Sequence, residues 1–305
     1  MQIDLTGRTA LVTGSTAGIG HAIAVGLAGA GASVVVNGRG QERVDEAVKS
    51  VAEAAGAGGR VRGVASDLGG AEGAQELIDS EPDVDVLVNS VAVFAPQPVF
   101  EIPDDEWLRF FQTNVMSGVR LARHYVPRMV ERGWGRTIFV SSESAVQIPA
   151  EMVHYGMTKT AQLAVARGMA ESVSGSGVTI NSVLPGPTQS EGIEDFLSQM
   201  GGGEDGQSIE EIGRDFVMRE RPTSLIERLA TTEEWRTSWS TSPPSRRQPP
   251  RVRRCAWTAA CFGASPSGGL PRRTARAPRA GAGAALRLRA PAGRGRSARV
   301  WPGRA

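Results

Sequence analysis

Cysteine is absent from the first 234 residues, and the whole chain of 305 residues has only Cys255 and Cys261. A disulfide framework and a cysteine-based metal site are therefore excluded from that part of the chain, and we expect no bound metal. No apolar run approaches the roughly 20 residues that are needed to cross a bilayer. The chain also lacks a basic-then-apolar signal pattern at its start. These absences predict a soluble, cytoplasmic protein that does not enter a membrane.

Aspartate, glutamate and lysine are absent after Glu234, where the chain has sixteen arginines instead. The formal net charge of +2 therefore conceals a charge of −14 on residues 1–234 and of +16 on residues 235–305. The tail consists largely of Arg, Pro, Ala, Gly and Ser and has no helical or strand periodicity. We expect a folded domain over residues 1–234 and a disordered tail over residues 235–305.

Short runs rich in Val and Ile alternate with helical patterns along the first part of the chain. The runs lack polar alternation, which is typical of parallel strands that are buried on both faces. The predicted strands are residues 9–13, 33–36, 61–65, 84–88, 136–141 and 178–183. The predicted helices are residues 19–30, 42–54, 104–131 and 155–173. This order predicts an α/β fold with a doubly wound parallel sheet, a Rossmann-type three-layer sandwich.

A glycine-rich loop with the sequence TGSTAGIG follows the first predicted strand and opens the first predicted helix. A pyrophosphate needs close approach to backbone N–H groups at a helix N-terminus, and glycines permit that approach. A plain tight turn is the alternative, but the position between strand and helix favours a dinucleotide site. The loop residues that we assign to cofactor binding are Gly14, Ser15, Thr16, Gly18, Ile19 and Gly20.

Tyr155 and Lys159 lie four residues apart in a predicted helix, so their side chains share one face. A free tyrosine has a pKa of about 10, and a nearby cation lowers that pKa toward the range useful for proton transfer. Ser142 lies thirteen residues before Tyr155, at the end of the fifth predicted strand. Residues 1–234 have only two tyrosines and two lysines, so this spacing favours a catalytic group over coincidence.

Together the glycine loop and the Ser, Tyr and Lys spacing resemble the short-chain dehydrogenase/reductase family over residues 1–234. The resemblance implies that Tyr155 transfers the proton and that Lys159 lowers the pKa of Tyr155 and holds the nicotinamide ribose. It implies that Ser142 polarises the substrate carbonyl, with the adjacent Ser141 as the alternative. It also implies that Asn114 holds a water molecule that links the lysine to solvent.

The resemblance also implies contacts to the cofactor elsewhere in the chain. Asp67 and Leu68 follow the third predicted strand, where the family contacts the adenine ring. Thr188 would bind the nicotinamide carboxamide beside a Pro-Gly turn. Residues 90–92 depart from the Asn-Ala-Gly that the family has after its conserved asparagine position. The remaining assigned cofactor residues are Asn89, Pro185 and Gly186.

The end of the second predicted strand bears on the choice of cofactor. Gly38 occupies the position where the family often has an acid that binds the ribose hydroxyls of NAD. Arg39 follows and could pair with the 2′-phosphate of NADP. A solvated loop arginine is the alternative, and residues 15–17 add no second basic residue. The sequence thus favours NADP(H), with NAD(H) as the alternative cofactor.

The resemblance implies a flexible substrate lid from about Gln189 to Arg221. Glu143, Glu151 and His154 lie near the predicted site in the sequence. Glu143 is unusual, because small residues are more common after the serine in the family. Each of the three side chains could contact substrate or face solvent, and the sequence leaves both open.

The start of the tail suggests a change of reading frame. The family continues from a Glu-Glu pair with Val-Ala, an amphipathic helix and a strand ending near Val-Asp-Gly-Gly, whereas here Trp235 follows Glu234. One G restored before the Trp235 codon gives Val-Ala and permits Leu-Arg-Val-Asp-Gly-Gly-Val across residues 255–261. We therefore hypothesise a single-base deletion near codon 235, and we expect the last helix and strand to be missing.

The implied activity is hydride transfer between a nicotinamide cofactor and a ketone or secondary alcohol, as in 3-oxoacyl reductases and related carbonyl reductases. The implied assembly is a homodimer or homotetramer if the C-terminus were intact. One alternative is an inactive product of a frameshifted gene. Another is a nucleic-acid binder that uses the arginine-rich tail, which the charge of −14 on residues 1–234 disfavours.

Overall fold

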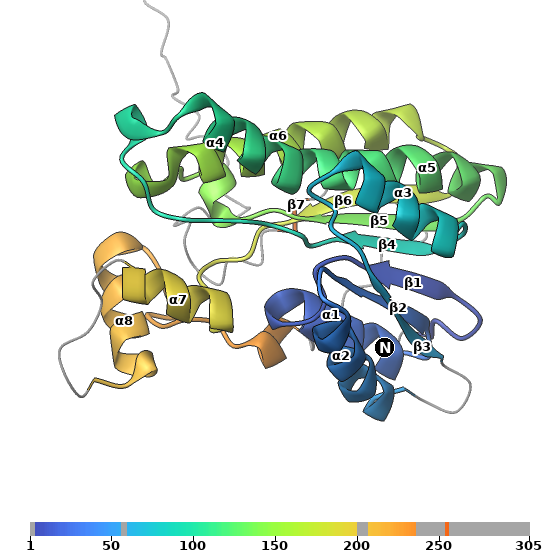
Figure 1. Cartoon of the computed structure of the whole chain (residues 1–305), viewed down its shortest axis with the longest axis horizontal. Helices are drawn as coiled ribbons and strands as arrows, with labels where there is room; N and C mark the ends of the chain where they lie inside the picture. Colours follow the sequence, from blue (N-terminus) through green and yellow to red (C-terminus); the bar gives the residue numbers. More distant parts are fainter. Residues whose placement is uncertain (1–3, 56–59, 200–206, 236–253, 256–305) are drawn as a thin grey trace, which may run out of the picture. The chain divides into compact units, whose positions relative to one another are not determined.

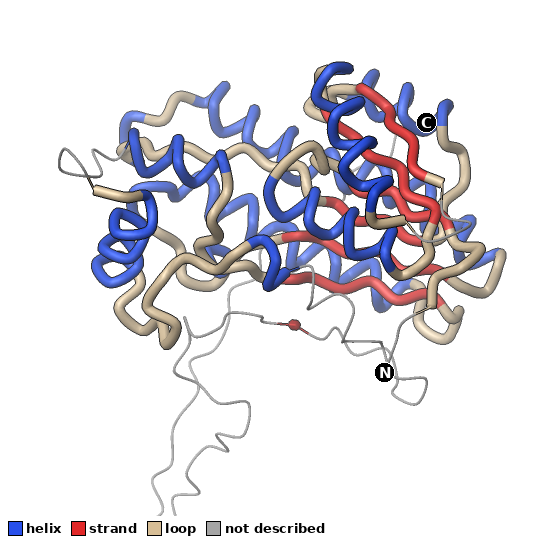
Figure 2. Tube along the Cα trace, turned by 90° about the horizontal axis from the view of Figure 1, so that it is seen from below, coloured by secondary structure: helices blue, strands red, loops and turns tan. Residues whose placement is uncertain are grey.

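The computed structural model of the chain describes residues 4–55, 60–199, 207–235 and 254–255. Its centre is a sheet of seven parallel strands in the order β3-β2-β1-β4-β5-β6-β7, with helices on both faces (Figures 1 and 2). The strands are β1 Thr9–Val12, β2 Ser33–Gly38, β3 Val61–Ala65, β4 Val86–Asn89, β5 Gly135–Val140, β6 Val178–Val183 and β7 Arg254–Cys255. The predicted doubly wound α/β fold is confirmed.

Two helices, α1 Gly18–Gly29 and α2 Gln41–Glu53, cover one face of the sheet over β1 to β3 (Figure 1). The helices on the other face are α3 Ala71–Ser80, α4 Asp104–Phe111, α5 Ser117–Glu131 and α6 Val153–Ser172. The sequence analysis missed α3. Its buried residues Gly73, Ala74, Leu77 and Ile78 recur at helical spacing, so the signal was present in the sequence.

Successive residues of each central strand contribute to two separate cores, because strand side chains alternate between faces. Leu11 of β1 packs with Leu77, Leu121 and Ala166 from α3, α5 and α6. Its neighbours Ala10 and Val12 pack with residues of α1 and α2 on the opposite face. The strands are therefore held from both sides, as the continuous apolar runs predict.

The strands β5 and β6 are less completely covered. In β6, Val178, Ile180 and Ser182 are buried, whereas Thr179, Asn181 and Val183 are partly exposed. The predicted last helix of the family would fall on residues 236–253, which lie outside the described residues. Among the described helices, α1 and α2 pack on β1 to β3 rather than on this face of β6.

The sheet has one more strand than the sequence predicts, and the expectation of a missing last strand is corrected here. Arg254–Cys255 pairs in parallel with Ser182–Val183 of β6. Pairing uses backbone N–H and C=O groups, so an open strand edge accepts an extended segment of almost any sequence. Apart from Trp235, the rest of the predicted tail lies outside the described residues, and the predicted disorder and frame change stay predictions.

Two further segments differ from simple expectation. The predicted helix over residues 104–131 is interrupted by a π-helical turn, η2 Gln112–Met116. The predicted lid contains two helices, α7 Glu191–Gln199 and α8 Ile209–Glu220. The described loops also contain three short turns of 3₁₀ helix, η1 Val99–Glu101, η3 Glu143–Ala145 and η4 Ala150–Met152.

Candidate active site

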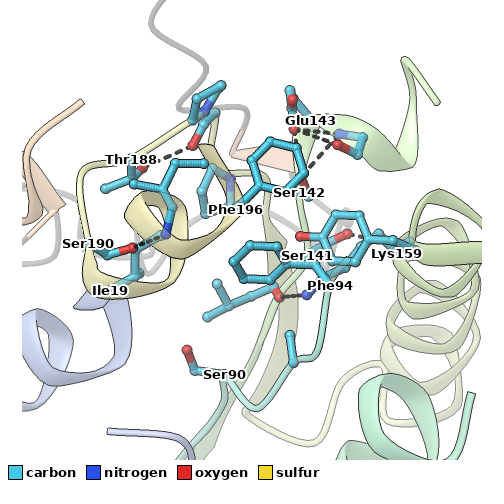
Figure 3. A pocket seen from close by; sticks show the side chains of 18 of the residues that line it. Ile19, Ser90, Phe94, Ser141, Ser142, Glu143, Lys159, Thr188, Ser190 and Phe196 are labelled. Atoms are coloured by element: carbon cyan, nitrogen blue, oxygen red, sulfur yellow. Dashed lines mark hydrogen bonds between the residues drawn. The ribbon is translucent and has the colours of Figure 1, made fainter. Parts of the chain in front are cut away.

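A cavity of about 230 Å³ lies at the carboxyl ends of β1, β4, β5 and β6. The sheet order reverses between β1 and β4, which is where open α/β sheets bind their ligands. Figure 3 shows that Ile19, Ser142, Lys159 and Thr188 approach this cavity from different elements. The topology thus brings together residues as far apart in the chain as Gly14 and Arg221, which 207 positions separate.

The glycine loop forms one wall of the cavity, and it fits a pyrophosphate. Gly14 has a φ of +60°, and a Cβ atom at Gly20 would lie 2.2 Å from the carbonyl oxygen of Gly14. Ala17 precedes α1 without a side-chain cap, and Ala17, Ile19 and Gly20 line the cavity. The first N–H groups of α1 are therefore available to an anion at the positive end of the helix.

Ser15 is a predicted cofactor residue that the structure turns away from the cavity. Its hydroxyl donates to the carbonyl oxygen of Val12 at 2.6 Å and accepts from the Asn37 N–H at 3.1 Å. The side chain therefore joins the glycine loop to β2. Thr16 and Gly18 are partly buried beside it, outside the cavity lining.

An acidic side chain at Gly38, the last residue of β2, would collide with Thr16 unless Thr16 moved. A Cβ atom at Gly38 would lie 2.5 Å from Cγ2 of Thr16. Arg39, by contrast, is exposed directly after the strand. The structure thus keeps the arrangement from which the sequence favours NADP(H).

The predicted cofactor residues that follow β3 and end β4 differ in their exposure. Asp67 is exposed, and its Oδ1 accepts from the Gly69 N–H at 2.9 Å. Leu68 is buried in the core. Asn89 is also buried and lies against Gly118 of α5, and within the described part of the chain its side-chain amide has no hydrogen-bond partner. The side chains of Leu68 and Asn89 are therefore not brought to the cavity.

Tyr155 and Lys159 line the cavity from one face of α6, as their spacing predicts. The Lys159 Nζ atom lies 5.5 Å from the centroid of the Tyr155 ring and donates to the carbonyl oxygen of Val140 at 2.9 Å. The Ser141 hydroxyl donates to the backbone oxygen of Lys159 at 2.9 Å, which ties β5 to α6. Ser142 is the serine whose hydroxyl lies beside that of Tyr155.

The electrostatics of the pair differ from the expectation. Burial lowers the pKa of Lys159 to about 7. Burial, and after it the carboxylate of Glu143, raises the pKa of Tyr155, while Ser142 and Arg221 act in the opposite direction. The sequence predicts that Lys159 lowers the pKa of Tyr155, but in the structure desolvation outweighs any effect of the lysine.

Asn114 lies in the π-helical turn η2, and its side chain links three segments. Its Nδ2 donates to the Val93 carbonyl oxygen at 2.9 Å and to Thr158 Oγ1 at 3.0 Å, and its Oδ1 accepts from the Val93 N–H at 2.7 Å. Its backbone oxygen accepts from Gln162 Nε2 at 2.5 Å. The residue holds α6 in place from outside the cavity, and the predicted water relay stays a prediction.

Pro185, Gly186 and Thr188 line the cavity after β6, as predicted. The Thr188 hydroxyl donates to the Gly186 carbonyl oxygen at 2.9 Å and accepts from Nε1 of Trp235 at 3.0 Å. Trp235 is buried. Sequence reasoning missed this contact because it placed Trp235 at the start of the tail.

Aromatic side chains form the far end of the cavity. The ring centroid of Phe94 lies 6.0 Å from that of Tyr155 and 6.1 Å from that of Phe196 (Figure 3). Other apolar side chains in this wall come from η4, α7 and α8, namely Met152, Ile193 and Phe216. The sequence carried no signal for these residues, since apolar side chains in a lid look like ordinary core residues.

The three residues that the sequence left open have different surroundings. Glu143 is buried, lines the cavity and forms an ion pair with Arg221. His154 is fully buried between the rings of Trp107 and Phe110, and burial lowers its pKa. Glu151 is partly buried and does not line the cavity.

Within the described ranges, no group of three or more His, Cys, Asp or Glu side chains could hold a metal ion. No helix in that part of the chain has the length and apolar character to span a bilayer.

A parallel sheet whose glycine loop and Tyr-Lys pair meet at one cavity defines an oxidoreductase of the Rossmann type. The chain belongs to the short-chain dehydrogenase family, whose family model, described as short chain dehydrogenase, matches residues 8–200. The chain is 47% identical over 238 residues to an uncharacterised oxidoreductase of Bacillus subtilis strain 168, YvaG, covering 77% of this chain and 88% of that protein.

Solved structures agree with this assignment. L-Sorbose reductase from Gluconobacter frateurii, solved with NADPH and L-sorbose, has a TM-score of 0.72 and 30% identity over 79% of this chain and 90% of that chain. A 3-oxoacyl (acyl-carrier-protein) reductase from Agrobacterium tumefaciens, solved with NADP, has a TM-score of 0.68 and 28% identity over 77% of this chain and 87% of that chain. Both are similar in fold.

Proposed function

We propose that the protein transfers hydride reversibly between NADP(H) and a ketone or secondary alcohol, with Tyr155 as the general acid and base. The observation that carries this proposal is the convergence of Tyr155, Ser142 and Lys159 on the cavity that the uncapped N-terminus of α1 also lines. Membership of an oxidoreductase family supports the reaction class.

Bound NADP(H) supplies the hydride in reduction and accepts it in oxidation. In reduction the Tyr155 hydroxyl donates its proton to the substrate oxygen, and in oxidation the Tyr155 phenolate takes the proton back. Ser142 hydrogen-bonds to the same oxygen and holds the substrate against Tyr155. Lys159 would hold the nicotinamide ribose. Because burial raises the pKa of Tyr155, its hydroxyl carries its proton before reduction begins.

The cofactor proposal rests on two features. The first turn of α1 would hold the pyrophosphate, and Arg39 would pair with the 2′-phosphate. At Gly38, the acid that would bind the ribose of NAD is absent, and its side chain would collide with Thr16. The solved relatives that contain NADPH and NADP support this preference.

The substrate proposal rests on the aromatic wall. Phe94, Phe196 and Phe216 surround the space beside Tyr155, so the carbonyl carbon of the substrate carries an apolar chain. Among the similar proteins, the 3-oxoacyl reductase acts on such a chain. We therefore propose a carbonyl reductase of the 3-oxoacyl type.

The test measures NADPH consumption with 3-oxoacyl thioesters, aliphatic ketones and a ketose. We expect turnover that is fastest with the 3-oxoacyl compound and slower with NADH. NADPH fluorescence measures binding separately. Failure to bind NADPH would overturn the proposal, and tight binding without any turnover would favour the inactive frameshifted product.

A further inference from the structure

An ion pair is buried in the otherwise apolar end of the cavity. Glu143 follows Ser142 directly and is 3% exposed, and Arg221 is 4% exposed. Arg221 Nε donates to Glu143 Oε1 at 2.8 Å. A charge placed there without a partner would be strongly unfavourable, because an apolar surrounding cannot replace its hydration. The two opposite charges therefore stabilise each other at this position.

The second oxygen of Glu143 holds the Ser142 hydroxyl in place. Glu143 Oε2 accepts from Ser142 Oγ at 2.5 Å, and it also accepts from the N–H and the hydroxyl of Ser144 (Figure 3). The Ser142 oxygen also accepts from the Ser144 N–H at 3.1 Å. Glu143 and the backbone of Ser144 together therefore hold this oxygen beside Tyr155.

Arg221 comes from the lid, directly after α8. The helices α7 and α8 contribute to an apolar cluster against which Tyr155 of α6 packs. The cluster includes Met152, Phe196, Phe216 and Leu229. The guanidinium of Arg221 also lies 5.9 Å from the ring centroid of Phe216. The cation beside Glu143 is thus supplied by the segment that covers the substrate.

The charged groups that face Tyr155 come from three elements. Glu143 lies on η3, Arg221 follows α8, and Lys159 lies on α6. The segments after β4 and in α7 present the apolar rings of Phe94 and Phe196 instead.

Groups behind Tyr155 are neutral or paired with one another. His154 packs against the ring of Phe110 from α4, and burial lowers the pKa of His154. Glu106 and Arg109 of α4 pair with each other. Glu143 and Arg221 are therefore the pair whose charges have opposite effects on the pKa of the Tyr155 hydroxyl.

We propose that Glu143 and Arg221 are a positioning pair for the proposed reaction: Glu143 fixes the Ser142 hydroxyl, and Arg221 brings the neutralising charge with the lid. This inference rests on the proposed function. With the pair intact, Tyr155 faces a compensated charge. Without Arg221 it faces a bare carboxylate, and without the carboxylate it faces a bare guanidinium.

Removing the charge of Glu143 and removing that of Arg221 should then shift the pKa of Tyr155 in opposite directions. A phenolate is disfavoured by a nearby negative charge and favoured by a positive one. Glu143→Gln therefore lowers the pKa of Tyr155, and Arg221→Gln raises it. Alcohol oxidation needs the Tyr155 phenolate. The pH at which the oxidation rate rises should therefore be lower in Glu143→Gln and higher in Arg221→Gln.

The test compares pH profiles of alcohol oxidation and carbonyl reduction by the full chain. We expect each single variant to shift the profile by about one pH unit, in opposite directions, and Glu143→Gln/Arg221→Gln to return it close to the original. Arg221→Lys keeps the charge and should keep the profile. Arg219→Gln is the matched control, because it removes an exposed arginine from the same helix end.

A second readout is independent of turnover. The chain has only two tyrosines, so the phenolate absorbance of each variant, minus that of the same variant with Tyr155→Phe, reports Tyr155. Its onset on raising the pH should come earlier in Glu143→Gln and later in Arg221→Gln. Shifts in one shared direction, or lower rates with unmoved onsets, would overturn the inference. The proposed function is judged separately, on turnover by the unaltered protein and its loss in Tyr155→Phe.

Discussion

The cavity has two halves that are built in different ways. The cofactor half consists of the glycine loop and the start of α1, where Gly14, Gly20 and uncapped backbone N–H groups do the binding. The substrate half consists of side chains that meet across the fold, above all Glu143 with Arg221 and Phe94 with Phe196. Backbone geometry makes the first half readable from a local motif, whereas the second half exists only after folding.

The strands beneath the two halves differ in the same sense. Every residue of β4 is buried, and β1 and β2 are buried apart from their ends. The substrate half stands on β5 and β6, whose residues alternate between buried and partly exposed. The cofactor half is thus supported from both faces of the sheet, and the substrate half less completely.

The largest effect that separates the halves is expected from Tyr155→Phe. Loss of the hydroxyl removes the proposed general acid, and such catalysis typically contributes about 10²–10⁴-fold. We expect kcat for carbonyl reduction to fall by roughly 10³-fold, while NADPH binding measured by fluorescence changes little. Activity that survives this change would exclude the proposed mechanism.

Gly20→Ala should damage the cofactor half instead. The new Cβ atom would lie 2.2 Å from the Gly14 carbonyl oxygen, so the loop must open. We expect NADPH binding to weaken by at least about tenfold, the equivalent of 1.4 kcal/mol. Gly168→Ala is the control, since a Cβ atom at Gly168 meets nothing within 4 Å and alanine favours a helix. Unchanged NADPH affinity in Gly20→Ala would contradict the proposed pyrophosphate position.

Restoring the reading frame before Trp235 should strengthen the support of the substrate half. The restored helix and strand would cover β5 and β6 with apolar side chains. We expect the thermal midpoint to rise by about 5–10 °C, because 1 kcal/mol corresponds to about 2–4 °C in a domain of this size. Size-exclusion chromatography should show a dimer or tetramer. A midpoint and a size identical to those of the present chain would reject the hypothesis of a deleted base.

Arg39→Ala should have the narrowest effect, confined to cofactor choice. A hydrogen bond to a charged group is worth about 1.5–3 kcal/mol, so we expect KM for NADPH to rise by about tenfold or more. The KM for NADH should stay within twofold, because NADH has no 2′-phosphate. Arg60→Ala, another exposed arginine, is the control. Equal losses with both cofactors would show that Arg39 does not read the 2′-phosphate.

Most of the fold could be predicted because its signals are local. Buried parallel strands are short apolar runs, and six of them lie close to their predicted positions. The helix α3 was missed although its apolar residues have helical spacing. The π-helical turn η2 could not be predicted, because its stabilisation comes from Asn114 contacts to segments that are distant in the chain.

The candidate site was predicted as a set of positions, and the structure assigned the side chains. Tyr155, Lys159 and Ser142 reach the cavity from the positions that the motif spacing gave. Ser15, named from the glycine loop, and Asn114, named from the family resemblance, direct their side chains into the surrounding structure. A motif fixes where the backbone passes, but hydrogen bonds to neighbouring segments decide where each side chain turns.

The sequence by itself determined the sheet, the glycine loop and the Tyr-Lys pair, because each depends on residues that are close together in the chain or that end neighbouring strands. Only the tertiary structure determined that Glu143 is buried and paired with a cation. Its partner Arg221 lies 78 residues further along the chain, and no periodicity links the two. Burial makes an unpaired charge unfavourable, so the fold had to bring the carboxylate and the guanidinium together for either to lie there.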